Sequence, residues 1–152
     1  MISIAARTQL IADEGTRQHV YDDATGMPIG PGSIVKGNPT IGVGRNVGPS
    51  GPGISSAEAL NLLNGDLDRI ERALNGAVPS WVKWPAIARD VACMVAFNCG
   101  VDGFLTFRRM IDAIESGDLA AAAAELMDSK AARELPDRYS RMSMALRRGA
   151  WT

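Results

Sequence analysis

The stretch that decides the fold reads I-A-D-E-G-T-R-Q-H-V-Y-D-D over residues 11–23 and returns as T-I-G-V-G-R-N over residues 40–46. It places Glu14 at the end of an apolar-periodic segment, Asp23 nine residues further on, and Thr40 at the head of a short alternating strand. Two carboxylates and a hydroxyl that a tight turn brings together can protonate a leaving oxygen and direct a water molecule. These three residues are therefore the first candidates for a catalytic site.

The region around this stretch is rich in loops. Residues 24–53 contain nine Gly and five Pro, a density that forbids a long helix. We expect residues 20–26 to form a strand that enters a turn and residues 40–44 to form the returning strand, so that the pair is a hairpin with an enlarged tip. The aliphatic residues between the Gly and Pro positions exceed what a solvated linker needs. The sequence therefore predicts a small, loop-rich lobe over about residues 14–54.

The residues on either side of this lobe show helical periodicity. Ser3 can cap a first helix that ends near Glu14 and Gly15. The sequence S-S-A-E over residues 55–58 matches a capping box and opens a long amphipathic helix, for which Gly76 is a plausible stop. The apolar face of this helix has spacings of three and four: Leu60, Leu63, Leu67, Ile70 and Leu74.

The second half of the chain is predicted to be entirely helical. Residues 86–98 are nearly all apolar up to Gly100, which is typical of a helix at the centre of its lobe. Further helices are expected over residues 103–114, 118–127 and 136–148. Together with residues 1–13, the segment from residue 55 to residue 152 would form a larger helical lobe within a single domain.

Composition narrows the function classes. The 152 residues are 46% hydrophobic and 22% charged, which indicates a globular protein. Cys93 and Cys99 would lie about 9 Å apart along a helix, beyond the limit of roughly 7 Å for a disulfide, so both are expected to be buried free thiols. With His19 as the lone histidine, the sequence offers no metal-ligand spacing, which argues against a zinc amidase or metallopeptidase.

The charge pattern and the hydropathy argue against two further classes. A net charge of −1 is not that of a nucleic-acid-binding protein. Residues 129–148 nevertheless carry six basic and two acidic side chains, which fits either a surface for an anionic polymer or a solvated helix face. Arg7 interrupts the N-terminal apolar residues, so we expect no secretory signal, and no run approaches the ~18 apolar residues of a membrane span.

Combined, the motifs E-G-x-R, x-Y-x-D and T-I-G-x-G-x-N resemble the phage-type lysozymes, the muramidases of glycoside hydrolase family 24. The signature of that family is a Glu, eight residues, an Asp, usually five residues, and a Thr that opens T-I-G-x-G. Further blocks follow in the family's order: I-S-S-A-E-A-L-N-L-L-N-G-D-L-D, M-V-A-F-N-C-G-V-D-G-F-L-T-F, P-D-R-Y-S-R and R-R-G-A-W. The resemblance implies an α+β, lysozyme-like fold, with a cleft between a small lobe and a helical lobe.

The resemblance also implies roles for individual residues. Glu14 would be the general acid, Asp23 would stabilise the oxocarbenium-like state or orient the attacking water, and Thr40 would position that water. An acid needs a raised pKa from an apolar wall, whereas its partner must stay ionised near solvent, and a helix end and a hairpin meet those two needs. The family favours inversion of configuration.

Supporting roles follow by the same route. Arg138 matches the arginine that pairs with the catalytic Glu14, and Arg17 would lie on the next turn if the first helix persists that far. Phe97 and Asn98 match cleft positions, where an aromatic face and an amide can hold a sugar and its N-acetyl group. For Phe97, a place in the core is an equally good interpretation.

The sequence departs from the family pattern in three places. Sixteen residues, instead of the usual five, separate Asp23 from Thr40. Because of this insert, Thr25 competes with Thr40 for the role of the hydroxyl that positions the water. Arg45 stands where the family often has His, and we expect Arg45 to pair with Asp66 without a pH switch. A Trp common in the late helical region is absent, with Ala131 near its place.

The resemblance predicts hydrolysis of the β-1,4 bond between N-acetylmuramic acid and N-acetylglucosamine in peptidoglycan glycan strands, without a metal or cofactor. As an endolysin, the protein would be a monomer that accumulates in the host cytoplasm and reaches the periplasm and wall through a lesion made by a holin. We expect no nucleic-acid partner and no stable membrane insertion. The alternatives are a lytic transglycosylase or chitinase of the same fold, and a non-catalytic wall-binding or virion module.

Overall fold

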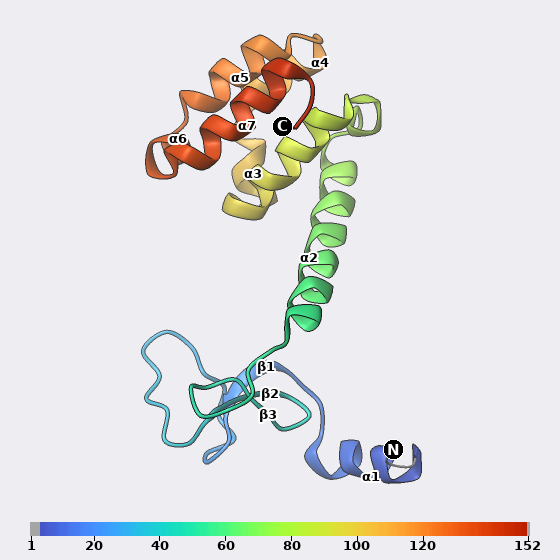
Figure 1. Cartoon of the computed structure of the whole chain (residues 1–152), viewed down its shortest axis with the longest axis vertical. Coiled ribbons are helices and arrows are strands. Elements are labelled where there is room, and N and C mark those ends of the chain that lie inside the picture. Colours follow the sequence, from blue (N-terminus) through green and yellow to red (C-terminus); the bar gives the residue numbers. More distant parts are fainter. Residues whose placement is uncertain (1–3, 152) are drawn as a thin grey trace. The chain divides into compact units, whose positions relative to one another are not determined.

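The computed structural model describes residues 4–151, which form two compact units. The first unit runs through Leu60 and the second, helical unit begins at Asn61. The elements in chain order (Figure 1) are α1 (Ile4–Glu14), β1 (Arg17–Asp22), β2 (Pro39–Gly42), β3 (Arg45–Asn46), α2 (Ser56–Ala77), the 3-10 helix η1 (Trp81–Lys83), α3 (Ala86–Leu105), α4 (Arg108–Glu115), α5 (Leu119–Met127), α6 (Lys130–Glu134) and α7 (Pro136–Arg148). The predicted α+β class is confirmed, whereas the division into lobes at residues 14 and 54 stays a prediction.

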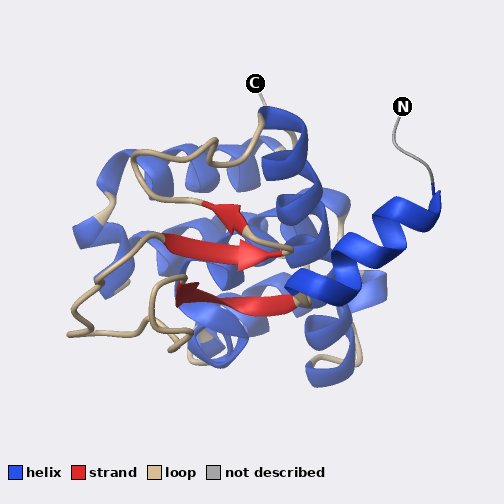
Figure 2. Ribbon diagram, turned by 90° about the horizontal axis from the view of Figure 1, so that it is seen from below, coloured by secondary structure: helices blue, strands red, loops and turns tan. Residues whose placement is uncertain are grey.

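The first unit is built on an antiparallel sheet with strand order β1-β2-β3 (Figure 2). The predicted hairpin is confirmed, with Tyr21 opposite Thr40 in the register, and β3 adds a strand that was not predicted. The turn between β2 and β3 is tight because Gly42 and Gly44 both have a positive φ, at 67° and 66°. Left-handed backbone of this kind is the reason that the T-I-G-V-G motif needs glycine twice.

Helix α1 ends where the sequence predicts. Gly15 has a φ of 69° and donates its N–H to the carbonyl of Ile11, which stops the helix at Glu14. The predicted cap, Ser3, lies outside the described residues. Arg17 belongs to β1, so the helix does not persist to the further turn on which Arg17 would have lain. The glycine that ends the helix is the physical reason.

The predicted capping box opens helix α2. The Ser55 N–H donates to Glu58 Oε2 at 2.8 Å, and the Glu58 N–H donates to Ser55 Oγ at 3.3 Å. The helix runs to Ala77, one residue past the predicted stop. It begins in the first unit and continues into the helical unit, and along its apolar face Leu60 is exposed whereas Leu74 is fully buried.

Helix α3 provides the centre of the helical unit. It breaks at Gly100, where φ is 78° and ψ is 163°, and then resumes to Leu105. The predicted helix over residues 103–114 is therefore wrong at its start. Residues 103–105 complete α3, the Thr106 hydroxyl donates to the Gly103 carbonyl, and α4 begins only at Arg108.

The core of the helical unit is apolar. Helix α7 packs against α5 and α3, and the buried Ser143 hydroxyl donates to the Ala123 carbonyl of α5 (Figure 1). The largest fully buried side chains are Tyr139, Phe104, Leu74, Met110, Leu126, Met142, Leu146, Val91 and Val95. Asp118, the predicted first residue of its helix, caps α5. Helix α7 keeps its predicted bounds, whereas α6 was not foreseen as a separate helix.

Both cysteines are free, but only Cys93 is buried. The expectation of burial is wrong for Cys99, which lies exposed in the last turn before the break at Gly100 and donates its thiol to the Val95 carbonyl. Within residues 4–151, no single helix is long and apolar enough to cross a membrane, and α3 with α4 would qualify only as a pair bent by 97°.

Candidate active site

The loop between β1 and β2 is closed at its base by Asp22, which sequence reasoning missed. This carboxylate is buried and accepts the backbone N–H groups of Ala24, Lys36 and Gly37 at 2.8–3.0 Å. The N–H of Lys36 is the largest cause that lowers the pKa of Asp22, and burial opposes it. The two ends of the insert are thus tied together. Strand alternation, which places Asp22 on the same face as the half-buried Val20, was the available signal.

Asp23 is exposed and is held by one residue on the opposite side of the loop. Its Oδ1 accepts the Asn38 N–H at 2.6 Å, and its Oδ2 accepts the Asn38 side-chain amide at 3.1 Å. Both hydrogen bonds lower the pKa of Asp23, and the one from the Asn38 backbone N–H has the larger effect. A Cβ on Gly37 would overlap Asp23 Oδ1, so the carboxylate rests where only glycine fits. Asp23 is therefore fixed as an ionised, solvent-accessible group.

Thr40 is the buried hydroxyl of the middle strand. Its Oγ1 donates to the Asn38 carbonyl at 3.1 Å, and the same carbonyl accepts the Asp23 N–H, also at 3.1 Å. The structure thus brings Asp23 and Thr40 together despite the insert between them. The rival Thr25 instead accepts the Met27 N–H within a local turn. The roles of Asp23 and Thr40 stay predictions.

Glu14 lies against the turn between β2 and β3. Its side chain is exposed at the end of α1, and a Cβ built on Gly44 would stand 3.2 Å from Glu14 Oε2. The second glycine of T-I-G-V-G therefore leaves room for this carboxylate as well as providing the left-handed backbone. The apolar wall that a general acid needs stays a prediction.

Arg17 braces the loop from β1. Its guanidinium donates to the Gly26 carbonyl at 2.7 Å and lies over the ring of Tyr21, 4.2 Å from the ring centroid. A cation above an aromatic face is attracted by the ring quadrupole. Arg17 therefore supports the entrance of the loop that Asp22 closes.

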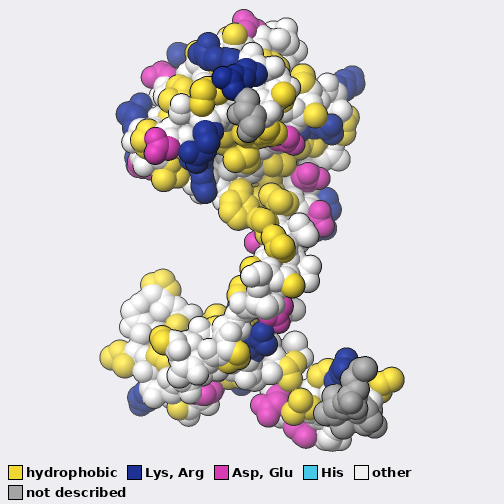
Figure 3. All heavy atoms as spheres, viewed as in Figure 1, with side chains coloured by type: hydrophobic (Ala, Val, Ile, Leu, Met, Phe, Trp, Pro, Cys, Tyr) yellow, Lys and Arg dark blue, Asp and Glu magenta, His cyan; other side chains and the backbone are white. Residues whose placement is uncertain are grey.

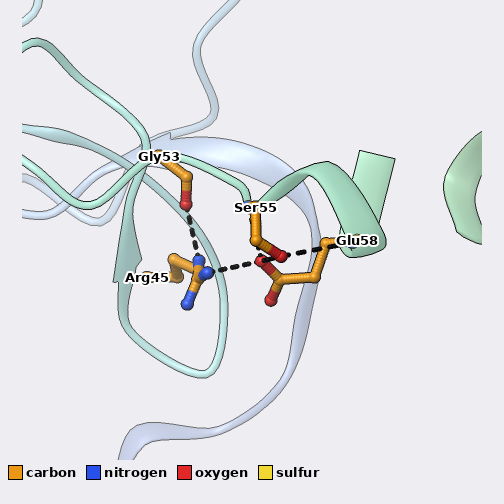
Figure 4. A network of polar contacts seen from close by, with 4 residues as sticks. All are labelled: Arg45, Gly53, Ser55 and Glu58. Atoms are coloured by element: carbon orange, nitrogen blue, oxygen red, sulfur yellow. Dashed lines mark hydrogen bonds and ion pairs between the residues drawn. The ribbon is translucent and has the colours of Figure 1, made fainter. Parts of the chain in front are cut away.

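The expected pairing of Arg45 with Asp66 would join residues of different units, and it stays a prediction. Arg45 donates Nε to the Gly53 carbonyl at 2.7 Å and Nη2 to Glu58 Oε2 at 2.6 Å (Figure 4), whereas Asp66 pairs with Arg69. The capping box holds Glu58 beside β3, within reach of Arg45. The pKa of Glu58 is lowered most by the hydrogen bond from the Ser55 N–H, and then by those from the Ser55 hydroxyl and Arg45. Arg45 and Glu58 therefore both remain charged.

The remaining candidates lie in the helical unit. Phe97 is 47% exposed and lines a hollow of about 480 Å³ with Ile70, so it is not a core residue of that unit. The amide of Asn98 donates to the buried Tyr139 hydroxyl at 3.1 Å and accepts from Arg138 Nη1 at 3.4 Å. Pairing of Arg138 with Glu14 would join residues of different units, and it stays a prediction.

Two surfaces of the helical unit can be compared with the expectations from the sequence. Ala131, near the expected place of the family's Trp, lines a cavity of about 600 Å³ together with Cys99 and Met110. Lys and Arg side chains gather on the face that carries α6 and α7 (Figure 3). This distribution fits the basic segment at residues 129–148.

Comparison with known proteins decides the family. Residues 12–141 match the phage lysozyme family model. The chain belongs to the phage lysozyme family. The lysozyme-like fold predicted from the sequence is thereby confirmed. The chain is also 29% identical, over 152 aligned residues and 90% of its length, to the pre-baseplate central spike protein Gp5 of Enterobacteria phage T4. It spans only 26% of the length of that relative.

Proposed function

We propose that this member of the phage lysozyme family is a muramidase that hydrolyses the β-1,4 bond between N-acetylmuramic acid and N-acetylglucosamine in peptidoglycan. The observation that carries the proposal is the meeting of Asp23 and Thr40 at Asn38, with Glu14 at the turn that follows the same strand. Family membership supports peptidoglycan hydrolysis of the muramidase type.

The proposed chemistry divides the work among three side chains. Glu14 donates its proton to the glycosidic oxygen as the bond to the anomeric carbon breaks. The Thr40 hydroxyl donates its proton in a hydrogen bond to the Asn38 carbonyl. The lone pairs of Thr40 Oγ1 are therefore free to accept a hydrogen bond from a water molecule. Asp23, ionised, accepts the second proton of that water as its oxygen attacks the opposite face of the sugar, and configuration is inverted.

Release of reducing ends from purified peptidoglycan tests the proposal. Glu14→Gln is expected to lower the rate by about 10²–10⁴-fold, the usual contribution of a general acid, while binding to sedimented walls is retained. Asp13→Asn is the matched control, because Asp13 is an exposed acid on the same helix that accepts a local bond from Gln9. Wild-type hydrolysis by Glu14→Gln would overturn the assignment. Anhydro ends would indicate a lytic transglycosylase instead.

We propose further that the protein acts as an endolysin, which waits in the host cytoplasm until a holin opens the membrane and then reaches the wall. The relative in phage T4 is named as a central spike protein, and this favours a virion-associated lysozyme or a non-catalytic virion module as the second candidate. Cytoplasmic expression that leaves cells intact until their membrane is permeabilised would support the endolysin. Recovery of the chain in purified virions would support the second candidate, as would a wild-type protein that is inert on peptidoglycan.

A further inference from the structure

We propose that Asn38 is a positioning residue that holds the Asp23 carboxylate and the Thr40 hydroxyl in one arrangement, and that Ser50 fixes the orientation of its amide. This inference rests on the proposed muramidase function and deepens it. None of the family motifs in the sequence includes Asn38. Its assignment comes from the hydrogen bonds around the base of the loop.

Asn38 uses three of its polar groups on the two candidate residues. Its N–H and its side-chain amide donate to different oxygens of Asp23, which fixes the plane of the carboxylate. Its carbonyl accepts from the Asp23 N–H and from the Thr40 hydroxyl. One residue therefore sets the orientation of both groups that would direct the water, because neither can turn without losing a bond to it.

The fourth polar group of Asn38 is anchored from the second loop. Its Oδ1 accepts the Ser50 hydroxyl at 3.1 Å, and Ser50 Oγ accepts the side-chain amide of Asn46 at 3.4 Å. Since Oδ1 receives a donor, the amide N–H groups must face Asp23. A Cβ on Gly51 would overlap Asn46, so this loop packs closely on the end of β3. The Gly/Pro-rich segment after β3 thus has a role in holding Asp23.

The insert acquires a different meaning from this arrangement. Asp22 ties the two ends of the loop, and Asn38 reaches Asp23 from the β2 side. The geometry of Asp23 is consequently set by the base of the loop and by the second loop, not by the length of the tip. This explains how eleven additional residues are compatible with a site on Asp23 and Thr40.

The test compares Asn38→Leu, which removes the amide, with Asn38→Asp, which also adds a like charge. We expect kcat to fall about 10-fold, because the groups that direct the water would be misplaced, while KM changes little. The acidic limb of the kcat profile is expected to move to higher pH, further for Asn38→Asp than for Asn38→Leu, because Asp23 loses a donor that favours its ionised form. Ser50→Ala should move the limb in the same direction by less, and it keeps the test valid if an Asn38 variant fails to fold. Asn64→Asp, an exposed position on α2, is the control.

A second readout does not depend on activity. The carboxyl ¹³C resonance of Asp23, followed through a pH titration, should move with the acidic limb in each variant. An unchanged titration of Asp23 would overturn the inference. A titration that moves while the acidic limb stays in place would also overturn it. Full activity of Asp23→Asn, in contrast, would refute the proposed catalytic role itself, whatever the Asn38 variants do.

Discussion

The two units of the molecule bury different kinds of side chain. The helical unit buries a continuous apolar core around α3, including Val91, Val95 and Phe104. In the first unit, among the residues whose burial is described, the buried side chains are the polar Asp22 and Thr40. The candidate catalytic residues thus stand on a framework held by hydrogen bonds, whereas stability resides mainly in the apolar framework.

This difference sets what each unit can tolerate. The first unit leaves large apolar side chains in solvent, with Ile34 88% and Met27 65% exposed. Its loops therefore depend on satisfied backbone groups, since little apolar surface is removed from water there. Changes in the helical core should reduce stability without altering the chemistry of the site. Changes at the base of the β1–β2 loop should alter the chemistry of the site and reduce stability less.

The largest expected effect comes from the helical core. Phe104→Ala removes a fully buried ring and should lower the free energy of unfolding by about 3–5 kcal/mol, measured by urea denaturation. Phe97→Ala, on the same helix but 47% exposed, is the matched control and should cost about 1 kcal/mol or less. Equal losses for the two variants would show that the helical unit is not stabilised as its burial indicates.

A smaller effect, on activity, is expected at the turn between β2 and β3. Gly44→Ala and Gly42→Ala both force a side chain into left-handed backbone, and each should cost about 1 kcal/mol or more of stability. Only the Cβ at position 44 would crowd Glu14, because position 42 has open space around it. Gly44→Ala should therefore lose about 10-fold more peptidoglycan hydrolysis than Gly42→Ala. Equal activities of the two variants would show that the β2–β3 turn does not position Glu14.

The helices were predictable because their signals are local. The capping box at residues 55–58, the Asp118 cap and the αL glycine at position 149 each act within a single turn of chain. The start of α4 was missed because Gly103 and Phe104 read as a beginning, whereas α3 resumes after the break at Gly100 and runs to Leu105. Residue types do not show that a helix resumes after a left-handed glycine.

The site was only partly predictable for a related reason. Motif spacing singles out Glu14, Asp23 and Thr40, but two of the three donors to Asp22 are backbone groups fourteen and fifteen residues away, which no side-chain pattern marks. Asn38 was missed for the same reason. The contact of Arg45 with Glu58 was also missed, although the capping box holds Glu58 within reach of Arg45.

The smallest and most local effect is expected from acid. The structure holds the pKa of Asp22 and Asp23 below the ordinary value of 3.8, so their stabilisation is complete above that pH and is lost as the pH falls through the lowered folded-state pKa. On the alkaline side, burial raises the pKa of Cys93 from 9.0 to about 11, so its contribution is complete below 9.0 and is lost as the pH rises towards 11. Acid should therefore loosen the loop base first, and alkali the helical core.

Amide proton shifts at the loop base can resolve this acid response residue by residue. From about pH 6 to about pH 2, the amides of residues 36, 37 and 38 should shift before those of the helical core, because they donate to the two carboxylates. Asp22→Asn should abolish the response at Lys36 and Gly37 but leave the response at Asn38, whose acceptor is Asp23. If the amides of the helical core shifted first, the base of the β1–β2 loop would not be the most acid-sensitive part of the molecule. Separate responses of the two carboxylates would instead show that Asp22 closes the loop independently of Asp23 and of the role proposed for it.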